Sequence, residues 1–84
     1  MPSKEATVSE VIAILRRVNA DKPGPIAAGT RILTDLDLDS LKMIELMDSL
    51  KTNYGVDFAV PPQSLDDLRT PETIAAAIQR ALGA

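Results

Sequence analysis

Cysteine and histidine are both absent from this 84-residue sequence. Without cysteine the chain forms no disulfide and offers no thiolate ligand to a metal, and without histidine it lacks the commonest general base. Aspartate and serine alone provide no activated nucleophile, so an enzyme is the least favoured class of protein.

Aromatic residues are also scarce, at 2% of the chain, although 45% of the residues are hydrophobic. Aliphatic side chains must therefore fill the core, which favours packed helices over a β-sandwich. The length is typical of one small domain, here residues 1–84.

No apolar run approaches the roughly 20 residues that a membrane-spanning helix needs. The first ten residues, MPSKEATVSE, lack the apolar region of a signal peptide. A net charge of −3 argues against binding to nucleic acid or to anionic membranes. We therefore expect a monomeric cytoplasmic protein that does not insert into membranes.

Apolar periodicity and helix-capping residues predict an all-α fold with four helices, the third of them short. The first expected helix runs from about Ser3 to Asn19, and the second runs from Ser40 to about Tyr54 and is ended by Gly55. A short third helix is expected over SLDDL, capped by Ser64, and a last helix starts at Pro71 with Thr70 as its cap. VDFAVPPQ has the apolar character of a strand, but its two prolines argue against one.

A loop of about 20 residues joins the first two helices, and its segment DKPGPIAAG contains two prolines and two glycines. Such a length is unusual in a compact domain and often indicates function. Its apolar residues predict that several of them pack against the core and hold the loop there; these residues are Ile26, Ile32, Leu33, Leu36 and Leu38.

The acidic end of this loop allows two interpretations that rest on its residues alone. Asp35, Asp37 and Asp39 have the spacing of a calcium-binding EF-hand, but that loop needs glycine at its sixth position and glutamate at its twelfth, where Ser40 and Leu46 stand. Alternatively, Ser40 simply caps a helix and the acids favour its N-terminus, because serine is a preferred cap and the helix dipole attracts negative charge.

The longer segment LDLDSLKMIELMDSLKTNYGVDF resembles the phosphopantetheine attachment region of acyl carrier proteins. In that family DSL opens the second helix, and a glutamate and a leucine follow five and six residues after the serine. Here Ser40, Glu45 and Leu46 hold those positions. The segment SLDDLRTPETIAAAIQ also resembles the family's third and fourth helices. The resemblance covers nearly the whole chain and implies a four-helix bundle of acyl-carrier type.

The resemblance also implies a function and a prosthetic group. A separate phosphopantetheinyl transferase would move 4′-phosphopantetheine from coenzyme A to the Ser40 hydroxyl, and Asp39 would help that enzyme to place its substrate and magnesium. A helix N-terminus suits the resulting phosphodiester, because free amides and the dipole favour an anion. Cargo would travel as a thioester, supplied by an acyl- or aminoacyl-loading ligase and delivered to downstream transferases.

Acyl carrier proteins dock on their partners through the second helix, which implies partner-binding roles for Leu41, Lys42, Ile44, Glu45, Met47 and Asp48. Two plainer alternatives stay open: Leu41 and Met47 as core residues, and Glu45 and Asp48 as solvated charges. The candidates for lining a cargo cleft, all of which would be needed as core in any case, are Ala27, Ala28, Ile32, Met43, Leu46, Leu68, Ile74 and Ile78.

Three positions depart from the carriers of primary fatty acid synthesis. Asp37 replaces a glycine, Lys42 replaces an acid, and Lys51 begins a segment where those carriers have glutamates. Because charge complementarity selects partners, we expect a specialised carrier in a lipid, lipopolysaccharide or polyketide pathway. The alternatives are an aminoacyl or peptidyl carrier loaded by an adenylating ligase, and an unmodified helical adaptor.

Overall fold

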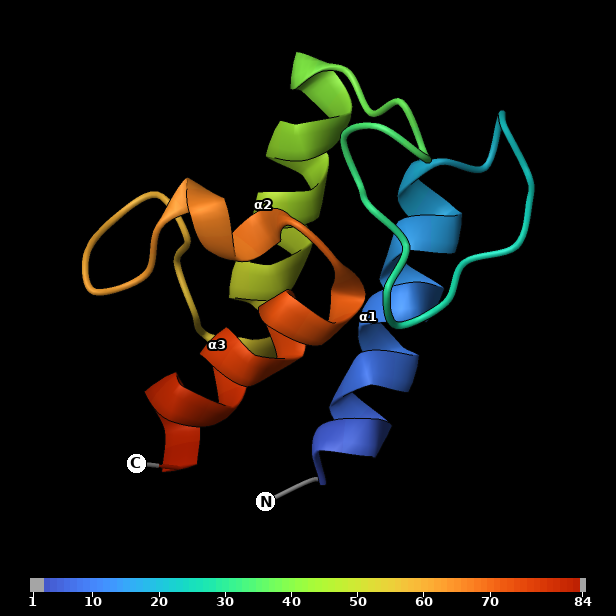
Figure 1. Cartoon of the computed structure of the whole chain (residues 1–84). Helices are drawn as coiled ribbons and strands as arrows, with labels where there is room; N and C mark the ends of the chain where they lie inside the picture. The colour runs from blue at the N-terminus through green and yellow to red at the C-terminus, as the bar shows by residue number, and fades with distance from the viewer. Residues whose placement is uncertain (1–2, 84) are drawn as a thin grey trace.

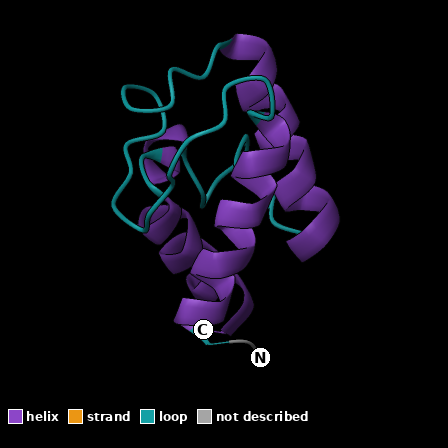
Figure 2. Ribbon diagram, turned by 90° about the vertical axis from the view of Figure 1, so that its right-hand side faces the viewer, coloured by secondary structure: helices purple, strands orange, loops and turns teal. Residues whose placement is uncertain are grey.

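The computed structural model describes residues 3–83, which form three α-helices, one 3-10 helix and no strand (Figure 2). The elements are α1 (Lys4–Val18), α2 (Ser40–Tyr54), the 3-10 helix η1 (Leu65–Leu68) and α3 (Pro71–Gly83). The predicted all-helical class is confirmed. The predicted count of four α-helices is not, and residues 1, 2 and 84 of the expected domain lie outside the described part.

The limits of α1 and α2 follow from local capping, as the sequence predicts. The Ser3 hydroxyl accepts a hydrogen bond from the amide of Ala6 at 3.1 Å, and α1 ends at Asn19. Gly55 ends α2 with φ +71°, in the left-handed region where glycine carries no steric penalty.

The short third element is a single 3-10 turn, because only two residues separate its end at Leu68 from the start of α3 at Pro71. The Asp67 carboxylate accepts a hydrogen bond from the backbone amide of Ser64 at 3.1 Å, which starts the turn. Pro71 then disfavours the helical conformation at Thr70, so η1 cannot continue into α3. Instead, the Thr70 hydroxyl caps α3 by accepting from the amide of Thr73 at 3.0 Å.

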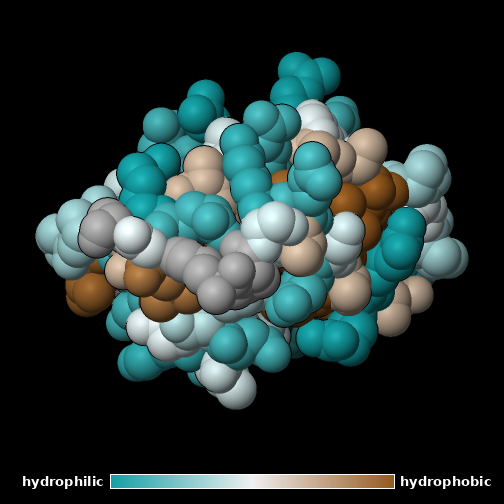
Figure 3. Space-filling model, turned by 90° about the horizontal axis from the view of Figure 1, so that it is seen from below, coloured by the Kyte–Doolittle hydropathy of each residue, from teal (hydrophilic) through white to brown (hydrophobic). Residues whose placement is uncertain are grey.

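Helix α1 contacts both α2 and α3, and η1 packs against α3. The start of α1 and the end of α3 lie at the same end of the molecule, whereas α2 begins at the opposite end (Figure 1). The face near the termini is mainly hydrophilic, with small separate hydrophobic areas (Figure 3). None of the helices formed by residues 3–83 has the length and hydrophobicity needed to cross a membrane.

Aliphatic side chains and one phenylalanine make up the core. Its fully buried members come from every helix and from the loops: Val11, Leu15, Ile32, Leu46, Leu50, Phe58, Leu68, Ile74 and Ile78. The prediction that aliphatic residues fill the core is therefore confirmed.

Residues 19–39, the long loop, are fastened to the junction between η1 and α3. The amide of Ile32 donates to the Arg69 carbonyl at 2.9 Å, and the amide of Glu72 donates to the Ala28 carbonyl at 3.0 Å. Ile32 and Leu38 are buried, as predicted. Ile26 and Leu36 also pack against the core, so the prediction that several of these residues hold the loop there is confirmed, and Leu33, at 58% exposed, is the exception.

Candidate functional site

The acidic junction before α2 places Asp39, and not Ser40, at the helix cap. Asp39 is extended, at φ −85° and ψ 178°, and its Oδ1 accepts a hydrogen bond from the amide of Lys42 at 2.9 Å. Its carbonyl accepts from the amide of Met43 at 3.0 Å. Ser40 is the first helical residue, so the interpretation of Ser40 as an ordinary cap is wrong.

This arrangement leaves the Ser40 hydroxyl available for chemistry. The residue is exposed, and within residues 3–83 no group makes a hydrogen bond to its hydroxyl. The amides of Ser40 and Leu41 belong to the first turn, whose amides have no helical acceptor. A phosphodiester on Ser40 Oγ would find those donors and the positive end of the helix dipole beside it. The residues present therefore fit the prosthetic group.

The three acids of the junction act separately. Asp35 Oδ2 accepts a hydrogen bond from the amide of Arg31 at 2.9 Å, whereas Asp37 is exposed and lies 3.7 Å from the Lys22 ammonium. Asp39 caps α2. No cluster of acidic side chains suited to a metal ion occurs among the described residues.

Asp37 has the left-handed conformation, at φ +53°. Aspartate tolerates this region better than most residues, but glycine enters it at no steric cost. The backbone therefore explains why a glycine is acceptable at this position in the carriers that the sequence resembles.

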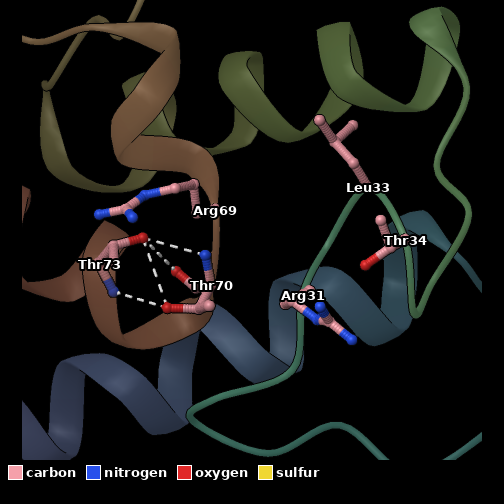
Figure 4. A pocket seen from close by; sticks show the side chains of 6 residues that line it. All are labelled: Arg31, Leu33, Thr34, Arg69, Thr70 and Thr73. Atoms are coloured by element: carbon pink, nitrogen blue, oxygen red, sulfur yellow. Dashed lines mark hydrogen bonds between the residues drawn. The ribbon is translucent and has the colours of Figure 1, made fainter.

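A hollow of about 430 Å³ lies beside Ser40, between α2 and η1. Its lining is mostly apolar and consists of Leu33, Leu38, Asp39, Ser40, Met43, Ile44, Met47, Leu65, Asp66, Leu68 and Arg69. A second hollow of about 360 Å³ shares Leu33 and Arg69 with it (Figure 4). The two hollows are therefore neighbours, since both are lined by these two side chains.

Most of the predicted cleft residues take the core role that the sequence also allows them. Met43 and Leu68 line the hollow beside Ser40. Four other candidates are fully buried and line neither hollow: Ile32, Leu46, Ile74 and Ile78. Ala27 and Ala28 line neither of them either. Exposed leucines at 33 and 65 were missed, because exposed apolar residues in short turns carry no periodic signal.

The predicted docking residues divide into two groups. Leu41 and Ile44 are 66% and 62% exposed, and Glu45 and Asp48 are exposed on the same face of α2. Within residues 3–83, neither acid has an ion-pair partner. Met47, in contrast, is half-buried and packs against the core.

The Lys42 ammonium, which the sequence places on the docking face, is engaged by acceptors within the protein. Its side chain is only 15% exposed, and Nζ donates to Asn19 Oδ1 at 2.7 Å and to Asp21 Oδ1 at 2.6 Å. The hydrogen bond from Lys42 lowers the pKa of the Asp21 carboxyl below its usual value. Lysine at this position is therefore an internal cation that joins α2 to the end of α1.

Taken together, an aliphatic helical fold, an exposed serine at a helix start and an adjacent apolar hollow define a small helical protein with a surface hydroxyl, unpaired within residues 3–83, beside an apolar surface. Comparison with known proteins agrees. The family described as "Phosphopantetheine attachment site" matches residues 9–78.

An acyl carrier protein of Rhodococcus erythropolis is 33% identical over 78 residues, which cover 93% of this chain and 84% of that protein. A meromycolate extension acyl carrier protein of Mycolicibacterium smegmatis is 34% identical over 79 residues, covering 89% of this chain and 78% of its own length. The corresponding Mycobacterium tuberculosis protein is 31% identical, and the alignment spans 93% of this chain but 66% of that relative.

The chain belongs to the acyl carrier protein family, whose members bear a covalently attached 4′-phosphopantetheine. Membership implies interaction with a phosphopantetheinyl transferase and with acyl-handling enzymes.

Proposed function

We propose that the protein is a discrete acyl carrier and that Ser40 Oγ is the attachment point of its 4′-phosphopantetheine. The observation that carries this proposal is the exposed Ser40 hydroxyl at the start of α2, which no described residue holds. Because the Asp39 carboxylate caps the helix, the hydroxyl has no structural task to give up on modification.

In the modification, Ser40 Oγ forms a bond to the phosphorus of the pantetheine phosphate of coenzyme A. The bond from that phosphorus to the nucleotide part of coenzyme A breaks, and the hydroxyl proton passes to a base of the transferase. This chain would contribute the exposed oxygen and the Asp39 charge beside it. The attached group, when present, supplies the thiol that carries cargo, which the chain itself lacks because it has no cysteine.

The protein would then act without a catalytic group of its own, as a monomer in the cytoplasm. The acyl group is the proposed cargo, and a specialised lipid pathway is the proposed setting. Support for this setting comes from relatives whose names specify meromycolate extension. An aminoacyl cargo would use the same serine, so the loading ligase and the cargo distinguish these two kinds of carrier.

Partner enzymes would dock on the exposed face of α2 next to Ser40. This face combines two apolar side chains, Leu41 and Ile44, with two acids, Glu45 and Asp48. Such a surface suits an enzyme with basic side chains around an apolar depression, since charge complementarity speeds association and selects partners. Met47 and Lys42 contribute less to this face, because both are engaged within the molecule.

The test is the intact mass after incubation with coenzyme A, magnesium and a broad-specificity phosphopantetheinyl transferase. The expected result is a gain of one phosphopantetheine on the parent chain. Ser40→Ala should gain nothing, whereas Ser49→Ala, which removes a second serine of α2, should gain as much as the parent.

No gain with several transferases, on a chain that circular dichroism shows to be folded, would refute the carrier function and favour an unmodified helical adaptor. A gain that persists in Ser40→Ala would refute the attachment point alone.

A further inference from the structure

Lys42 is held more firmly than any other lysine of the described chain. The side chains of the other described lysines in ion pairs, such as Lys51 at 63% and Lys22 at 55%, are far more exposed than that of Lys42 at 15%. Their ammonium groups lie 3.5 Å or more from the nearest carboxylate oxygen, compared with 2.6 Å for Lys42 and Asp21.

Asn19, one of the two acceptors of the Lys42 ammonium, is itself fixed. Asn19 is 3% exposed and ends α1, where its amide donates to the Leu15 carbonyl at 2.9 Å. Its carbonyl accepts from the amide of Lys22 at 3.0 Å. The Asn19 side chain is therefore a rigid acceptor attached to the end of α1. A charge-assisted hydrogen bond to such an acceptor gives a defined geometry.

The other end of Lys42 is fixed at the attachment site. Lys42 follows Ser40 by two residues in the first turn of α2, and its backbone amide is the one that Asp39 Oδ1 caps. A single residue thus connects the cap of α2, the turn that bears Ser40, and the end of α1.

We propose that Lys42 is a positioning residue for Ser40, because its ammonium fastens the first turn of α2 to Asn19 and Asp21 and thereby fixes the direction in which the hydroxyl is presented to the transferase. This inference rests on the proposed function of Ser40. It differs from a docking role, since Lys42 acts through bonds inside the protein and not through contact with a partner.

The test compares transferase kinetics for three variants at a temperature where each is fully folded. Lys42→Met removes the ammonium and keeps most of the side-chain length. Asp21→Ala leaves the lysine charge in place but removes one of its acceptors. Lys51→Met is the matched control, because it removes the same charge from the exposed side of the same helix, where the ion pair with Asp57 is long at 3.7 Å.

We expect kcat/KM for transfer to fall about tenfold in Lys42→Met, because small misplacements of a reacting group lower rates by up to two orders of magnitude. Asp21→Ala should fall in the same direction, and Lys51→Met should stay within about twofold of the parent, as suits an exposed weak pair. Hydrogen exchange of the Lys42 and Met43 amides should accelerate in Lys42→Met, while exchange at Leu50 stays unchanged.

The outcomes separate the inference from the function on which it rests. A parent chain that is never modified overturns both. A modified parent for which Lys42→Met matches Lys51→Met in rate and in exchange overturns the positioning role alone. Direct recognition of the lysine charge would slow Lys42→Met without faster exchange and would leave Asp21→Ala at the parental rate, and that result also overturns positioning.

Discussion

Asp39 has two tasks that two substitutions can separate. Its carboxylate caps α2 through the 2.9 Å hydrogen bond to the Lys42 amide, and its charge lies beside the proposed attachment oxygen. Asp39→Ala removes the cap and the charge together. Asp39→Asn keeps a capping oxygen, because asparagine and aspartate are similarly good caps, but removes the charge.

The expected losses of stability follow from those contacts. Removing a helix cap costs about 1 kcal/mol, with a range of roughly 0.5–2 kcal/mol. Losing a negative charge near the helix N-terminus costs about 0.3–1 kcal/mol. Asp39→Ala should therefore lower the free energy of unfolding by about 1–2 kcal/mol, and Asp39→Asn by about 0.5 kcal/mol. In a domain of this size each kcal/mol corresponds to roughly 4–8 °C in Tm.

The transfer reaction should rank the two variants differently. If the transferase needs the charge to place magnesium, both variants should be modified slowly, because a neutral amide is a much weaker ligand for that hard cation. Urea unfolding followed by far-ultraviolet circular dichroism gives the stabilities, and a time course of intact mass gives the rates. Glu5→Gln is the control, because Glu5 is an exposed acid in the first turn of α1, away from the docking face of α2 and with no cap to make.

Two results would refute this reasoning. Equal destabilisation by alanine and asparagine would mean that Asp39 Oδ1 does not cap the helix. Parental modification rates in Asp39→Asn would mean that the transferase does not require the Asp39 charge.

Three further predictions concern the fold. Asp37→Gly should change the free energy of unfolding by less than about 0.5 kcal/mol, because the relief of steric strain at φ +53° offsets the added freedom of the unfolded chain. Asp37→Val should lower the free energy of unfolding by more than about 1 kcal/mol, and urea unfolding measures both variants. Burial, together with the 2.8 Å hydrogen bond that Tyr54 donates to Glu10, raises the pKa of the Tyr54 hydroxyl. Above about pH 10 the hydroxyl loses its proton in the unfolded chain but keeps it in the folded protein, so the free energy of unfolding should fall as the pH rises past that value. Urea unfolding should show a smaller fall in Tyr54→Phe. Leu46→Ala, at a fully buried position, should cost about 2–5 kcal/mol, and Ile44→Ala, at an exposed one, less than about 0.5 kcal/mol, as measured by thermal unfolding.

The sequence predicts the parts of this fold that depend on neighbouring residues. Helices α1 and α2 have their predicted limits because caps, glycine and apolar spacing act over one or two turns. The position of the Asp39 cap was missed by one residue. Serine and aspartate are both good caps, and only the backbone conformation shows which of the two lies outside the helix.

Long-range contacts account for what the sequence does not predict. Lys42 resembles an exposed residue of α2 in every local respect, and its burial depends on Asn19 and Asp21, which lie about 20 residues earlier in the chain. The two roles open to the cleft candidates, core and cleft wall, could not be separated from the sequence for a related reason. Apolar periodicity identifies residues that face inward, but it does not distinguish a filled core, as at Leu46, from the wall of a hollow, as at Met43.

The contacts that hold the first turn of α2 are made by other residues than Ser40, the proposed site of modification. The first turn of α2 is fixed by the Asp39 carboxylate from one side and by the Lys42 ammonium from the other, and neither bond involves the serine hydroxyl. A bulky, charged group on Ser40 Oγ would therefore displace no bond of the fold described here. It would also lie where free amides favour an anion and where the apolar hollow between α2 and η1 is within reach. A carrier needs this separation, since it must remain the same folded surface for its partners before and after modification.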